Sequence, residues 1–136
     1  MSLLYLSTTD PLATVAHRVF GALLVTDWEE RFSDNYPGGN YFRGKAGEFK
    51  ITVSRESPDD WFYDEFQILV SITAPPTVPT PPNEAAELAA TELVRAGFRV
   101  AEQEAFTHHA TRWRVFSLDA LGNLKTTVLE RSLPTK

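Results

Sequence analysis

The sequence predicts an α+β fold: a largely antiparallel sheet with two helices packed on one face, in a single domain of residues 1–136. Two segments carry apolar residues at the 3.6-residue period of a helix, and most other segments alternate at the two-residue period of a strand. With 136 residues, 43% hydrophobic and 23% charged, the chain is long enough to bury one core. Together these observations indicate one globular domain of mixed class.

The chain should begin with a strand at 3–7 and continue into a helix. Asp10 and Pro11 form a helix start, because aspartate caps a helix and proline fits its first turn. Apolar residues then recur at helical spacing as far as residue 23, which leaves His17 on the polar face. We therefore expect an amphipathic helix of about three turns.

A second helix should follow Asn83 and end before Gly97, because glycine readily takes the left-handed conformation that terminates helices. Glu84 and Glu87 lie near the N-terminus of this helix, where its dipole favours negative charge. The stretch "PPTVPTPP" at 75–82 precedes it and should form a stiff, extended crossover from strand to helix.

The remaining segments alternate apolar and polar residues and are rich in β-branched and aromatic side chains. The strands expected from this pattern are 24–32, two further strands that end at about residue 54, and then 66–73, 98–105, 112–118 and 124–131. Turns are expected at 36–39, 44–47 and 119–123. Each helix is then preceded by one strand and followed by three, which predicts two β-α-β-β-β-like halves.

Charge is distributed unevenly along the chain. The net charge is −5, but residues Glu56 to Val94 contain eight acidic residues and no lysine or arginine. That stretch carries −8, and the rest, with thirteen bases and ten acids, carries +3. Such a stretch repels phosphate backbones and attracts a basic protein, so the pattern disfavours nucleic acid as a partner.

Catalytic and metal-binding motifs are missing from the sequence. The chain has no cysteine, no glycine-rich phosphate loop and no serine in a nucleophile-elbow context. His108 and His109 are adjacent, so on a strand their rings would point to opposite faces and could not share a metal. We predict no cofactor and no metal. No apolar run reaches the length of a membrane helix, and we expect a cytoplasmic protein.

The stretch "SPDDWFYDEF" at 57–66 combines acidic and aromatic side chains, which suits it to binding a cationic protein. Aromatic side chains bury a large area at low entropic cost, and carboxylates steer and pair with lysine and arginine. Phe62 and Phe66 are expected to fold inward. The stretch "TDWEERF" at 26–32 has the same mixture. The residues predicted to bind the partner are Trp61, Tyr63, Asp59, Asp60, Asp64, Glu65, Trp28 and Glu30.

Residues 27–56, "DWEERFSDNYPGGNYFRGKAGEFKITVSRE", followed by this acidic–aromatic stretch and the strand to residue 73, resemble small bacterial immunity proteins of polymorphic-toxin systems. The likeness lies in the pattern "ER-S-NY-GG-YFRG" and in the size and acidity of the chain. The resemblance implies a binding protein that covers the active site of a cognate toxin, often a basic nuclease. Carboxylates could there occupy the positions of substrate phosphates.

Two other functions remain open from the sequence. A secretion-type chaperone would also be a small acidic protein, and it would form a homodimer that holds an extended segment of its client. A small hydrolase or isomerase could use a pair of the many carboxylates as acid and base. That enzyme requires an apolar pocket with one acid inside.

Overall fold

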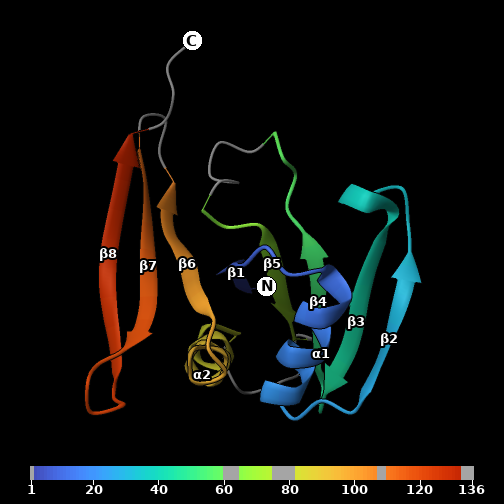
Figure 1. The fold of residues 1–136 in the computed structure, drawn as a ribbon, viewed down its shortest axis with the longest axis horizontal. Coiled ribbons are helices and arrows are strands. Elements are labelled where there is room, and N and C mark those ends of the chain that lie inside the picture. The colour runs from blue at the N-terminus through green and yellow to red at the C-terminus, as the bar shows by residue number, and fades with distance from the viewer. Residues whose placement is uncertain (1, 60–64, 75–81, 107–109, 133–136) are drawn as a thin grey trace.

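The computed structural model describes residues 2–59, 65–74, 82–106 and 110–132, which form a large antiparallel sheet and two α-helices (Figure 1). The elements in chain order are β1 (Ser2–Ser7), α1 (Leu12–Ala22), β2 (Asp27–Phe32), the 3-10 turn η1 (Pro37–Gly39), β3 (Asn40–Ala46), β4 (Phe49–Arg55), β5 (Ile68–Thr73), α2 (Pro82–Arg95), β6 (Arg99–Phe106), β7 (Ala110–Leu118) and β8 (Leu124–Ser132). The predicted α+β class, with an antiparallel sheet and two helices, is confirmed.

The strand order of the sheet is β2-β3-β4-β5-β1-β6-β7-β8, and every neighbouring pair is antiparallel. The first strand therefore lies in the middle of the sheet, between β5 and β6. The three strands after α1 run from one edge towards the centre, whereas the three after α2 run from the centre to the other edge. The strands that follow α1 and those that follow α2 thus enter the sheet in different ways.

One large core cluster joins the sheet to both helices. α1 packs on β3 and β4, and α2 packs on β1, β5, β6 and β7 (Figure 1). Leu4 and Leu6 of β1 are fully buried in this cluster together with Val15 and Phe20 of α1 and Leu93 of α2. Burial of each such side chain contributes about 1.5–3 kcal/mol, so this cluster is the main source of stability.

A second, smaller cluster contains Tyr5, Phe66, Ala101 and Trp113. Tyr5 lies between Leu4 and Leu6 in β1, and successive side chains of a strand point to opposite faces. The two clusters therefore lie on opposite faces of the central strands.

The end of α1 differs from the prediction, which placed residue 24 at the start of a strand. Leu24 instead closes the helix in the left-handed conformation, with φ +57°. The Val25 N–H donates to the Phe20 carbonyl at 2.8 Å, and the Leu24 N–H donates to the Gly21 carbonyl at 3.3 Å. These two bonds form a Schellman motif, which satisfies the last helical carbonyls before β2 begins at Asp27.

The structure also bears on four smaller expectations. The hairpin between β3 and β4 turns at Gly47 and Glu48, so Gly44 lies within β3 and not in the turn. Asp10 makes no side-chain capping bond to α1 and is paired with Arg18 at 3.4 Å. Gly97 follows α2 with φ +100°, as its predicted role requires. The crossover predicted at 75–82 lies outside the described residues, apart from its last proline.

Candidate partner-binding surface

The acidic–aromatic segment 57–66 connects β4 to β5, and its two ends are joined. The Glu56 N–H donates to the Gln67 carbonyl at 2.9 Å, and the Gln67 N–H donates to the Leu6 carbonyl at 3.1 Å. The Gln67 side chain also accepts from the Thr8 N–H at 3.0 Å. These bonds fix both ends of the segment to the sheet, so the chain leaves the sheet and returns to it at neighbouring positions.

Phe66 anchors the C-terminal end of the segment in the second core cluster. Its side chain is fully buried, as predicted, and stacks on Trp113 with ring centroids 5.4 Å apart. Tyr5 contacts the same indole edge-on at 4.8 Å. The Arg99 guanidinium lies 5.3 Å from the centre of the Phe66 ring. Stacked and edge-on aromatic pairs contribute about 0.5–1.5 kcal/mol each beyond their buried area.

The predicted binding residues within the segment are described only in part. Asp59 is exposed and follows a turn in which its N–H donates to the Ser57 hydroxyl at 3.3 Å. Glu65 is half-buried next to Phe66. The other four predicted residues of the segment lie outside the described residues; they are Asp60, Trp61, Tyr63 and Asp64. The described acids therefore sit at the two ends of the segment.

Glu30 belongs to a polar chain that leads to the start of this segment. Its carboxylate accepts from the Asn40 amide nitrogen at 2.9 Å, and the Asn40 amide oxygen accepts from the Arg55 guanidinium. Arg55 immediately precedes Glu56 in the sequence. Glu30 is exposed and is thereby held near the base of the segment.

Trp28 lies elsewhere, in the contact between β2 and α1. Its indole stacks on Phe20 with centroids 5.2 Å apart, and His17 packs edge-on against it at 4.7 Å. The side chain is half-buried and belongs to the rim of the main core. Trp28 pairs with Gly44, which in turn pairs with Ile51, four residues before Arg55. The structure therefore places Trp28 away from the described ends of the segment 57–66.

A polar hollow of about 410 Å³ lies beside the ends of the segment. Its lining includes Asp10 and Leu12 at the start of α1, Arg55 at the end of β4, and Gln67. A carboxylate-dependent enzyme requires an acid buried in an apolar pocket. Among the residues whose side-chain burial the structure describes, Ser54 is the one buried polar residue, and no carboxyl group is buried.

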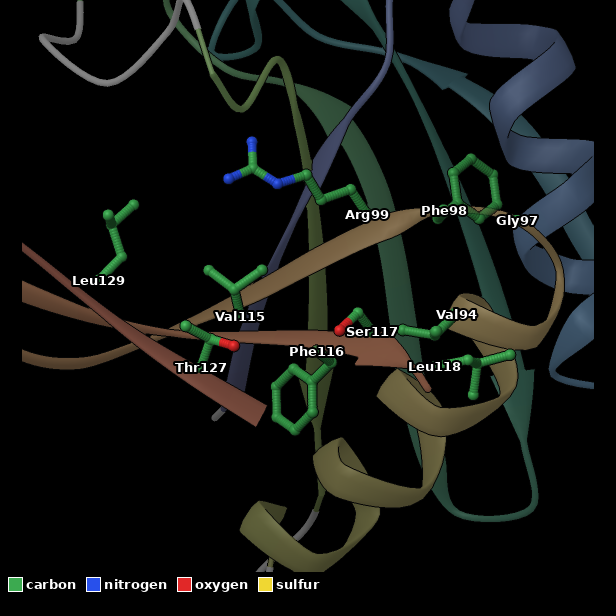
Figure 2. A pocket seen from close by; sticks show the side chains of 10 residues that line it. All are labelled: Val94, Gly97, Phe98, Arg99, Val115, Phe116, Ser117, Leu118, Thr127 and Leu129. Atoms are coloured by element: carbon green, nitrogen blue, oxygen red, sulfur yellow. The ribbon is translucent and has the colours of Figure 1, made fainter. Parts of the chain in front are cut away.

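A larger hollow, of about 560 Å³, lies between the start of β6 and the strands β7 and β8, and Figure 2 shows the side chains that line it. Arg99 is the one charged residue among the ten that line it, and apolar side chains such as Val115 and Leu129 form much of its wall. The sequence analysis did not identify this hollow, because its residues come from α2, β6, β7 and β8, and the order of those strands could not be predicted. Among the described residues, no group of three or more potential metal ligands lies together.

Comparisons with protein-family models, with curated proteins and with solved structures each find no match for this chain. Neither of the two described helices has the length and apolar character of a membrane-spanning helix.

Proposed function

We propose that this chain is a cytoplasmic, non-enzymatic binding protein that neutralises a basic protein partner, in the manner of an immunity protein and its toxin. The observation that carries the proposal is the charge distribution, with −8 and no base between Glu56 and Val94. An acidic surface of this kind accelerates the encounter with a cationic protein and repels nucleic acid.

The anchoring of the segment 57–66 supports a binding role. Both of its ends are fixed, by the hydrogen bond between Glu56 and Gln67 and by the burial of Phe66. A segment with fixed ends loses less conformational entropy when it binds than one with free ends. Trp61 and Tyr63 would then supply the apolar contacts, and Asp59, Asp60, Asp64 and Glu65 would pair with lysine and arginine of the partner.

We also infer that both helices cover one face of the sheet in two β-α-β-β-β-like halves, and that the partner meets the end of the sheet between β4 and β5. The shared core cluster of the two helices supports this arrangement. Glu30 lies towards that end through its contact with Asn40 and extends the acidic surface beyond the segment.

A salt-dependent pull-down tests the proposal. The tagged protein is incubated with a lysate of its source organism at low salt, and bound proteins are identified by mass spectrometry as the salt concentration is raised. We expect one basic protein, released as charge pairing is screened. Light scattering of the purified complex should give a one-to-one assembly, whereas a homodimer that holds an unfolded client would favour a chaperone.

Matched variants then locate the surface on the identified partner. Conversion of four segment acids (Asp59, Asp60, Asp64 and Glu65) to Asn or Gln should weaken binding at least tenfold. The control converts four acids elsewhere (Asp27, Glu29, Asp34 and Glu130), which changes the net charge equally. Replacement of Trp61 and Asp64 by alanine should together cost several kcal/mol, about the magnitude of an interface hot spot. Equal affinities for the two sets of acid variants would refute the assignment of this surface.

A further inference from the structure

An apolar groove lies at the other end of β4 from the acidic segment. It has a volume of about 470 Å³ and is formed by the end of α1, the hairpin between β3 and β4, and the middle of α2. Its lining is apolar except for one described residue, Glu92; the lining residues are Ala22, Leu23, Leu24, Ala46, Phe49, Ile51, Ile72, Leu88, Ala89 and Glu92. A volume of this size holds a few side chains.

Leu24 lies at one side of this groove in a strained backbone conformation that destabilises the fold. Its φ of +57° places it in the left-handed region, which costs a residue with a Cβ atom about 1–2 kcal/mol and costs glycine almost nothing. Its side chain is 88% exposed, so burial does not offset this strain. Folding alone would favour glycine here, and a strained, exposed leucine beside an apolar groove therefore points to a contact outside the chain.

Leu88 stands on α2 as the second exposed leucine of the groove. Its side chain is 69% exposed, although α2 buries Ala89 and Ala90 beside it. An exposed patch that joins two leucines to an apolar groove is typical of an interaction site.

The charges around the groove indicate what binds there. Glu48 lies at the hairpin turn next to Phe49, and Glu87 and Glu92 lie on α2 on either side of Leu88. Arg95 pairs with Glu92 at 3.0 Å and offsets its charge, so the negative charge of this described rim comes from Glu48 and Glu87. A bound segment with lysine or arginine next to its apolar side chains would complement this rim.

We propose that this groove binds a short segment of a partner protein in which apolar side chains are flanked by basic residues. A stable dimer of two copies would bury about 800 Å² on each copy, which is more than a groove for a few side chains provides. This binding site is separate from the segment 57–66, because the two lie at opposite ends of β4, a strand of seven residues. One partner could contact both only by extending along the length of the sheet.

The test is selection from a phage-displayed library of random 12-residue peptides on the wild-type protein, with removal of phage that bind the variant Leu24→Gly/Leu88→Ser. We expect enriched peptides with two or more large apolar residues next to lysine or arginine. A synthetic copy of an enriched peptide should bind the double variant at least tenfold more weakly than the wild type. Urea unfolding of the double variant separates loss of binding from unfolding, because Leu24→Gly relieves strain whereas Leu88→Ser places a weaker helix former in α2.

Leu121→Ser is the matched control, since Leu121 is also an exposed leucine, at 86%, but lies in the turn between β7 and β8. It should leave the affinity for the peptide unchanged. Failure to enrich any peptide, enrichment of acidic peptides, or equal affinity for the double variant would overturn the proposal. A wild-type dimer that becomes monomeric in the double variant would also overturn it, because a second copy would then occupy the groove.

Discussion

Gly44 determines how closely α1 and the side chain of Trp28 pack against β3. A Cβ atom at this position would lie 2.9 Å from the Phe20 ring, 2.9 Å from the Trp28 Cβ and 3.0 Å from a Val25 methyl group. These atoms belong to the packed rim of the main core and have little room to move. The stacking of Phe20 on Trp28 therefore depends on the missing side chain.

Gly44→Ala should accordingly destabilise the protein by about 1–3 kcal/mol, the usual cost of forcing an extra methyl group into a packed core. The free energy of unfolding in urea measures this loss. Gly21→Ala is the control, because no atom lies within 4 Å of a Cβ built there and Gly21 is in α1. Alanine at Gly21 should stabilise the helix by about 0.5–1 kcal/mol. A neutral result for Gly44→Ala would show that β2 and α1 shift without loss.

Leu24→Gly should raise the free energy of unfolding by about 1 kcal/mol, because glycine adopts the Schellman position without the strain that a Cβ atom causes. The measurement is again the urea midpoint. Leu24→Ala keeps the Cβ atom and should bring no comparable gain. If alanine stabilised the protein as much as glycine did, the effect would come from the exposed leucine and not from the backbone.

At the scale of the elements, the carboxylate of Asp119 stabilises the turn of the hairpin between β7 and β8. Asp119 accepts hydrogen bonds from the N–H groups of Asn123 and Leu121, both at 2.9 Å. The bond from Asn123 is the main cause that lowers the pKa of Asp119 below its usual value of 3.8, and Lys125 adds to it. The ionised form is thus favoured in the folded state.

A lowered folded pKa stabilises the protein above the unfolded pKa, and this contribution is lost as the pH falls through the folded value. We expect Asp119→Ala to be less stable than the wild type at pH 6. The difference should shrink progressively as the pH falls below 3.8. Urea unfolding of both proteins across this pH range measures it. A difference that stayed constant with pH would show that the turn does not depend on the charge.

The elements themselves were largely predictable from the sequence, because periodicity reports which side chains are buried. Both helices and the strands after α2 follow that pattern closely. Leu24 and Gly44 were placed wrongly, because a Schellman motif usually shows glycine and a glycine in a strand resembles one in a turn. The motif at Leu24 is local but lacks its usual glycine, whereas the place of Gly44 depends on tertiary contacts with Phe20 and Trp28 that no local pattern records.

At the scale of the whole molecule, the position of β1 in the middle of the sheet could not be predicted. Its neighbours are distant in sequence, as the pairings of Leu4 with Val70 and with Glu102 show. Because contacts between distant segments could not be predicted, only some of the candidate binding surfaces could be identified from the sequence. The acidic segment is continuous in sequence and was found, whereas the groove between Leu24 and Leu88 joins distant segments and was missed.

The central position of β1 also predicts how the molecule unfolds. Leu6 is fully buried in β1, which pairs with β5 on one side and with β6 on the other. Leu6→Ala should lower the free energy of unfolding by about 2–5 kcal/mol, in one transition that fluorescence and circular dichroism report together. Val128→Ala, on the edge strand β8 and 51% exposed, should have little effect. Two separate transitions would contradict a single cooperative domain.

The order in which the chain is synthesised adds a consequence of this topology. β1 is translated before all its neighbours in the sheet, and it gains one of them only when β5 has been made and the other only when β6 has followed. Until then a nascent chain on the ribosome presents Leu4 and Leu6 without the strands that cover their flanks. Cotranslational folding can therefore close the β2–β3–β4 sheet early, but β1 must wait for most of the chain. A ribosomal pause before β6 would prolong the exposure of its leucines to chaperones and to aggregation.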